Sequence, residues 1–225
     1  MTNLIWRYNQ KVTQETIDMG ALLQGELSNT KTIQIGHNSN YAIQNCELYF
    51  SPYSETYDGT SNSIKDYERL VWFGDNYPGC GVSLTQKYNV SGKIEAHSGI
   101  RITDAERFES KDIFAGYEME ILSGPSVGEK VKISEYLPES KVFILEGDFS
   151  SDVTGESYKI ELVEETFLKT RSASSYHYPV PLLHKAGTID RLEFVDIELK
   201  IKVPVYAVSA DTLLFDLNMN FINRE

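Results

Sequence analysis

Apolar and polar residues alternate strictly near the C-terminus of the chain. In VDIELKIKVPVYAV (195–208), every second residue from Val195 to Val205 is apolar, and the residues between them are charged or proline. This period of two predicts a β-strand with one packed face and one solvated face. Pro204 cannot donate a ladder hydrogen bond, which favours a sheet edge or the end of pairing there. The alternation returns in LLFDLNMNF (213–221), which predicts a neighbouring strand.

The first third of the chain contains shorter strand patterns. TIQIG (32–36), CELYFSP (46–52) and RLVWFGD (69–75) are apolar runs bounded by polar, turn-forming residues. Residues 12–25 fit either a short helix or the entry to a strand, and no segment sustains the 3.6-residue period of a long helix. The pattern therefore predicts an all-β protein.

Four runs of similar length occupy the middle of the chain. The separators between them are rich in turn formers, so neighbouring strands are expected to pair as antiparallel hairpins. We expect residues 1–100 and 164–225 to form one β sandwich, and residues 101–163 to form a small antiparallel β module inserted into it. The four runs are YEMEIL (117–122), KVKISEY (130–136), KVFILEG (141–147) and YKIELV (158–163).

The turn SGPSVGEK (123–130) has the glycines and lysine of a phosphate-binding loop, but not their order. Gly124 and Gly128 are four residues apart, and Glu129 stands where the phosphate-binding motif requires lysine. A strand pattern follows, whereas a phosphate-binding loop leads into a helix. The stretch predicts a hairpin turn, and we expect the chain to bind no nucleotide or other cofactor.

Net charge and the distribution of apolar residues limit the classes of partner that the chain could bind. The chain has 225 residues, of which 41% are hydrophobic, so it can bury a sizeable core, and its net charge is −12. A polyanion would be repelled, which argues against nucleic acid and against an anionic membrane surface. The N-terminus lacks the apolar core of a signal peptide, and no run approaches the roughly 20 apolar residues of a membrane span. We expect a soluble protein made in a cytoplasm.

Cysteine and histidine are sparse. Cys46 and Cys80 are most simply free thiols in a reducing compartment, and a disulfide requires that the fold bring them together. None of the four histidines has the spacing of a metal-binding motif, so no metal site is predicted. The four are His37, His97, His177 and His184.

The loop EGDFSSDVTGE (146–156) offers carboxylates, which are hard oxygen ligands. Its order is not that of a calcium-binding loop, so a solvated hairpin loop is favoured, and a bound cation stays the alternative. No GxSxG motif is present, and Cys80 between two glycines has no nearby base that would activate it. We therefore predict that the chain is not an enzyme. The carboxylates of the loop are Glu146, Asp148, Asp152 and Glu156.

The segment RSASSYHYPVPLL (171–183) is too polar and too rich in proline for a central strand. Its residues Tyr176, His177 and Tyr178 suit a protein interface, because tyrosine buries a large area at a low cost in entropy. Two alternatives stay open: these rings stack on a sugar, or they cover the edge of the sandwich.

The middle of the chain has an ordered pattern of strands and turns: a strand, Ser-Gly, a Gly turn, a strand ending in tyrosine, a polar turn, a Val-rich strand and a loop before G-x-x-Y-x-I. The positions that form the pattern are Ser123, Gly124, Gly128, Ile133, Tyr136, Lys141, Val142, Phe149, Gly155, Tyr158 and Ile160. This pattern resembles a small β module found in virion proteins of tailed bacteriophages. The segments 187–221 and 28–50 resemble the closing and opening strands of immunoglobulin-like (Ig-like) sandwiches in such proteins.

This resemblance implies an Ig-like β sandwich with an inserted module. It also implies a non-enzymatic structural component of the virion, in the tail, baseplate or neck, assembled in the host cytoplasm. Its partners would be other virion proteins and further copies of itself, as a homo-oligomer. The alternative function is a carbohydrate-binding β module that attaches to a host-surface glycan, with Tyr176 and Tyr178 as the stacking residues.

Overall fold

A computed structural model of the chain describes residues 4–12, 17–52, 81–167, 179–203, 205 and 215–223. The chain divides into two compact units. The sandwich unit comprises Met1–Gln86, Glu165–Leu182 and Gly187–Glu225, and the small unit comprises Lys87–Glu164 and Leu183–Ala186. Among the described residues, the only helical element is the short 3₁₀ helix η1 (His184–Ala186).

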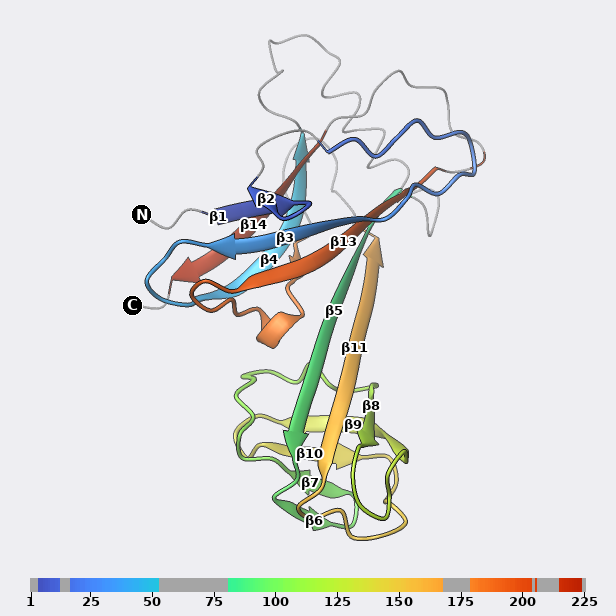
Figure 1. Cartoon of the computed structure of the whole chain (residues 1–225), viewed down its shortest axis with the longest axis vertical. Helices are drawn as coiled ribbons and strands as arrows, with labels where there is room; N and C mark the ends of the chain where they lie inside the picture. Colours follow the sequence, from blue (N-terminus) through green and yellow to red (C-terminus); the bar gives the residue numbers. More distant parts are fainter. Residues whose placement is uncertain are drawn as a thin grey trace. The chain divides into compact units, whose positions relative to one another are not determined.

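Antiparallel strands make up the rest of the regular structure (Figure 1). Strands β5 and β11 each have residues in both units. The strands are β1 (Leu4–Tyr8), β2 (Lys11–Val12), β3 (Lys31–His37), β4 (Ile43–Pro52), β5 (Gly81–Lys93), β6 (Ala96–Ser98), β7 (Arg101–Thr103), β8 (Glu118–Ile121), β9 (Lys130–Leu137), β10 (Val142–Leu145), β11 (Ser157–Phe167), β12 (Val180–Pro181), β13 (Phe194–Lys202) and β14 (Phe215–Asn223).

The sandwich unit contains two sheets that share one core. In the larger sheet the strands follow the order β2-β1-β3-β13-β5, and the three-stranded sheet has the order β12-β4-β14. Ile35 and Leu199 from the larger sheet join Leu48 and Met219 from the smaller one in a single buried cluster. The predicted all-β fold is confirmed, and two sheets that enclose a common core are consistent with the predicted β sandwich.

Strand β13 shows the predicted alternation. Val195, Ile197, Leu199 and Ile201 are buried, and the strand pairs with β3 on one side and β5 on the other. The prediction that the strand at 213–221 is its neighbour is wrong, because β14 pairs with β4 in the three-stranded sheet. The alternation in β13 was expected to continue to Val205, but the strand ends at Lys202 and the side chain of Val205 is 59% exposed. Beyond Lys202 the chain pairs with the segment that precedes β3, where Val203 N donates to Glu26 O at 2.9 Å.

Strand β4 begins at Ile43, earlier than the predicted start at Cys46. A β-bulge interrupts the alternation of apolar residues near its start, so the sequence pattern does not extend back to Ile43. Asn45 has a φ of 50°, and the pairing with β14 shifts register between Asn220 and Ile222. Asparagine tolerates this left-handed conformation better than most residues do. The extra residue brings Ile43, Cys46 and Leu48 to the same buried face although their spacing is uneven. The strand predicted at 69–75 lies outside the described residues.

The small unit contains two of the three predicted hairpins. The third, between β10 and β11, does not form, because β10 pairs with β7 and β11 pairs with β8. β8 pairs with β9 and β9 pairs with β10, both antiparallel, and the turn between β8 and β9 holds Gly124 and Gly128 at φ of 74° and 84°. The stretch that mimics a phosphate-binding loop is therefore a turn between two strands, and no helix follows it. The strand order of the larger sheet continues from β5 as β5-β11-β8-β9-β10-β7-β6, so the two ends of that sheet are β2 and β6.

The bounds of this unit in the structure differ from the predicted 101–163. The unit spans Lys87–Glu164 and includes Leu183–Ala186. The reason is packing: Val90, Ile94 and Leu183 are buried in the same cluster as the hairpin residues. At the centre of that cluster, aromatic rings meet with centroids 4.8 to 5.9 Å apart, mostly edge to face. These rings belong to Phe114, Tyr136, Phe143 and Tyr158.

Candidate functional site

Three charged side chains are buried together in the small unit, in the segment that follows β7. Asp104, Arg107 and Glu109 are 0%, 9% and 2% exposed. Arg107 Nε lies 3.2 Å from Asp104 Oδ2, and Arg107 Nη1 lies 3.6 Å from Glu109 Oε1. Arg107 Nη2 also donates to the carbonyl oxygen of Ser91 at 3.3 Å. One guanidinium group therefore neutralises part of the charge of two buried carboxylates.

Two tyrosines complete this network. Tyr158 Oη donates to Asp104 Oδ2 at 2.6 Å, and Tyr88 Oη donates to Glu109 Oε1 at 3.2 Å. Burial is the main cause that raises the pKa of Tyr158 far above its ordinary value, and the hydrogen bond to Asp104 adds to the effect. The hydroxyl therefore stays protonated and remains a donor at physiological pH.

Gly92 on β5 allows these groups to approach one another. A Cβ atom at this position would lie 2.2 Å from Asp104 Oδ2 and 2.7 Å from Tyr158 Oη, closer than any side chain tolerates. The carboxylate, guanidinium and hydroxyl groups of the network contact one another, and the backbone at Gly92 packs directly against them. This arrangement holds the small unit together, and its groups are already engaged within the protein.

Two carboxylates of the 146–156 loop lie beside His97, and the other two have separate partners. Asp148 Oδ1 lies 2.8 Å from His97 Nε2, and Asp152 Oδ1 lies 3.4 Å from His97 Nδ1. Glu146 Oε1 lies 3.1 Å from Lys132 Nζ. Asp152 accepts from the backbone N–H and hydroxyl of Thr154, and Glu156 accepts from the hydroxyl of Ser123. Within the part of the chain that the structure describes, no group of three or more His, Cys, Asp or Glu side chains could hold a metal ion.

The histidines have separate environments. The ring of His97 also contacts backbone on both sides, with Nε2 2.8 Å from Gly99 O and Nδ1 accepting from Val153 N. His37 is buried in the sandwich unit with Nε2 3.0 Å from Ile189 O, and His184 packs edge to face on Tyr88. His177 lies outside the described residues.

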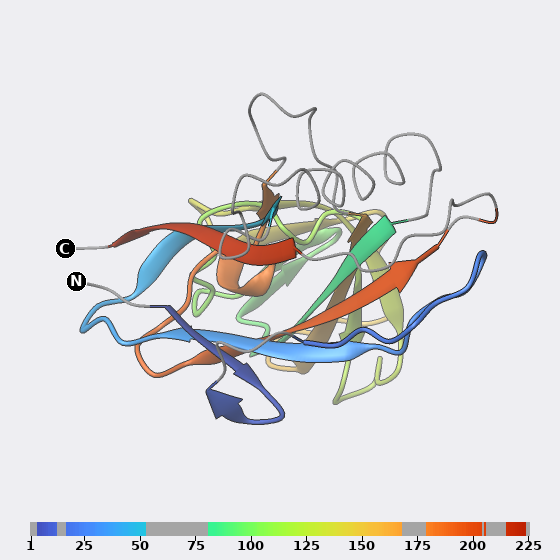
Figure 2. The same ribbon diagram turned by 90° about the horizontal axis from the view of Figure 1, so that it is seen from above.

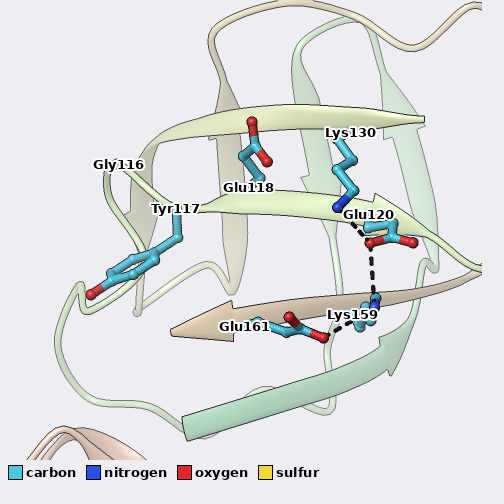
Figure 3. Close-up of a pocket in the computed structure, with 7 residues that line it drawn as sticks. All are labelled: Gly116, Tyr117, Glu118, Glu120, Lys130, Lys159 and Glu161. Carbon is cyan, nitrogen blue, oxygen red and sulfur yellow. Dashed lines mark hydrogen bonds and ion pairs between the residues drawn. The ribbon is translucent and has the colours of Figure 1, made fainter. Parts of the chain in front are cut away.

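A hollow of about 240 Å³ lies on the outer face of β8, β9 and β11 (Figure 3). Glu120 sits between two lysines, with Oε2 3.0 Å from Lys130 Nζ and 3.3 Å from Lys159 Nζ. Lys159 Nζ also donates to Glu161 Oε1 at 3.0 Å. The hollow is lined by Gly116, Tyr117, Glu118, Glu120, Lys130, Lys159 and Glu161.

The ion pairs shift the pKa values of Glu120 and Lys159. The hydrogen bond from Lys130 is the largest cause that lowers the pKa of Glu120, and the hydrogen bond to Glu161 is the largest cause that raises the pKa of Lys159. A carboxylate with a depressed pKa stabilises the fold at pH values above its unfolded pKa, and this contribution is lost as the pH falls through the folded pKa. Because solvent screens exposed pairs, the cluster is a surface ion-pair network that binds the three strands together weakly.

Cys46 is a buried thiol on β4 that we expect to be unreactive. Burial raises its pKa to about 12, so almost no thiolate exists at neutral pH. Iodoacetamide applied to the native protein should leave Cys46 unmodified, and the same reagent in denaturant should modify it fully, as read by peptide mass spectrometry. Rapid labelling of Cys46 in the folded protein would show that β4 opens readily. Cys80 lies outside the described residues, so its pairing stays untested.

The predicted interface residues Tyr176, His177 and Tyr178 lie outside the described residues, and their role stays a prediction. Sequence reasoning missed the buried network of Asp104, Arg107 and Glu109. The segment TDAERFESKD reads as a solvated loop, because its charges show no periodicity. The sequence signal that could have indicated the network is Gly92 in the interior of a strand pattern, because a glycine there often marks a close approach of other atoms to the backbone.

Comparison of the chain with known protein families and with curated proteins gave no match. Among the residues that the structure describes, no helix has the length and apolar character needed to cross a membrane.

Proposed function

We propose that this chain is a non-enzymatic structural component of a tailed-bacteriophage particle, in the tail, baseplate or neck. Its activity is assembly, through contacts with other virion proteins and with further copies of itself. The proposal starts from the resemblance of the middle of the chain to a small module of such proteins.

The observation that carries this proposal is the place of the resembling residues in the fold. They belong to one unit, in which the glycines occupy turns at positive φ and most of the other residues are buried. A pattern of this kind specifies a compact β module rather than a set of reactive groups. The turn glycines are Gly124, Gly128 and Gly155, and the buried residues are Ile133, Tyr136, Val142, Phe149, Tyr158 and Ile160.

Exposed apolar side chains on the sandwich unit also support assembly. Leu23, Leu27 and Val205 are each more than half exposed. They lie near one another because the segment 25–28 pairs with the end of β13, with Gly25 N donating to Val203 O at 3.1 Å. Apolar groups gathered on a surface are typical of protein contacts.

An inventory of purified particles tests the proposal. We expect quantitative mass spectrometry of washed virions to find the chain in a fixed copy number that matches the symmetry of a tail, baseplate or neck. A chain that is abundant in infected cells but absent from washed particles would contradict the proposal. Non-structural proteins encoded by the same genome provide the measure of background.

A further inference from the structure

The two sheets end in strands of very different character. Among the strands that the structure describes, three of the four end strands are short: β2 and β12 have two residues each and β6 has three, and β12 contains Pro181. Short edge strands and edge prolines are the means by which proteins prevent unwanted strand pairing. The fourth end strand, β14, has nine residues.

Strand β14 lacks these protective features. Its sequence FDLNMNFIN contains one charged residue, Asp216, and neither lysine nor proline. Within the described part of the chain it pairs with β4 alone, along most of its length. Ile222 is 60% exposed, and Leu217 and Phe221 are only partly buried against the core. Within the described residues, the strand (red in Figure 2) therefore presents a long, nearly uncharged edge.

The five central residues of β14 are symmetric in polarity about Met219, and the two pairs beyond them, Asp216 with Ile222 and Phe215 with Asn223, are not. These central residues read Leu-Asn-Met-Asn-Phe, so among them the residues at equal distances from Met219 have the same character. If a second β14 runs antiparallel to it with Met219 opposite Met219, Leu217 faces Phe221 and Asn218 faces Asn220. Residues directly opposite each other lie on the same face of a sheet, so apolar side chains meet apolar ones and amides meet amides.

We propose that β14 pairs antiparallel with β14 of a second copy of this chain, about a twofold axis at Met219. The pairing joins two three-stranded sheets into one continuous sheet, which is an isologous interface. This inference deepens the proposed assembly function and rests on it for its biological role. A second copy fits better than an unrelated strand because the match of polarity depends on the symmetry of β14 itself.

Charge is compatible with this pairing. Two chains with a net charge of −12 repel each other, but the register places Asp216 opposite Ile222 and not opposite another carboxylate. The remaining repulsion is long-range and is screened by salt. Self-association should therefore strengthen as the ionic strength rises.

Sedimentation velocity of the purified full chain over a concentration series tests the pairing. We expect a monomer–dimer equilibrium for the wild type. The double variant Asn218→Glu/Asn220→Glu places carboxylates opposite carboxylates twice, and should weaken dimerisation by about tenfold or more. The control Asn29→Glu/Thr30→Glu adds the same charge at two exposed positions outside β14 and should dimerise more nearly as the wild type does.

Hydrogen exchange of the wild type provides a test that needs no substitution. Peptides that cover 215–223 should exchange more slowly at concentrations at which the dimer forms than at those at which the chain is monomeric. A wild type that stays monomeric at all concentrations, a dimer that the β14 variant does not weaken, or exchange in 215–223 that is independent of concentration would each overturn the inference. Because these measurements use the isolated chain, they can fail while the particle inventory succeeds, and the reverse.

Discussion

Replacement of Arg107 by methionine is expected to destabilise the small unit by about 3–5 kcal/mol, because it leaves two buried carboxylates without their cation. Asp104 and Glu109 are almost completely buried, and the guanidinium group of Arg107 lies between them. Methionine preserves most of the side-chain volume, so the loss is mainly electrostatic. Urea denaturation followed by circular dichroism measures the change in the free energy of unfolding.

A matched control separates the loss of the buried network from the general effect of removing an arginine. Arg101→Met, at an exposed position on β7, is the matched control and should change the stability by less than about 0.5 kcal/mol. A destabilisation of Arg107→Met no larger than that of Arg101→Met would show that the buried network contributes little to stability.

Leu199→Ala is expected to destabilise the sandwich unit by about 2–5 kcal/mol, because it opens a cavity in a core that both sheets share. Leu199 is buried on β13, opposite Lys31 of β3 and Leu84 of β5. Leu192→Ala removes the same atoms from a side chain that is 73% exposed, and should cost less than about 0.5 kcal/mol. Similar losses of stability for the two variants, measured by thermal unfolding, would mean that Leu199 contributes little to the core.

The sequence predicts those parts of the fold that depend on local pattern. The alternation from Val195 to Ile201 specifies which face of β13 is buried, because a side-chain period of two leaves only one register that hides the apolar set. The turns around Gly124 and Gly128 likewise specify the hairpin, since both glycines adopt positive φ. The all-β class follows from these features.

Features that depend on contacts between distant residues were not predictable. The bulge at Asn45 appears in the sequence as a break in alternation, and nothing local shows that the fold compensates for it. The buried network joins the segment of Asp104, Arg107 and Glu109 to Tyr88 and Tyr158, which are distant in sequence, so the charges of that segment resemble those of a solvated loop. The limits of the small unit depend in the same way on Leu183, which is distant in sequence from its hairpins.

The position of the small unit within the chain affects how the protein folds. The sandwich can form only if the strands before Lys87 meet those after Glu164, which would ordinarily require the closure of a long loop. Local hairpins form faster than such distant pairings. Once the hairpins have formed, two backbone hydrogen bonds hold the end of β5 beside the start of β11. Gly155 N donates to Ile94 O at 2.7 Å, and Ile94 N donates to Glu156 O at 2.9 Å. We therefore expect the small unit to form early and to shorten the effective loop, so that its deletion slows the folding of the sandwich.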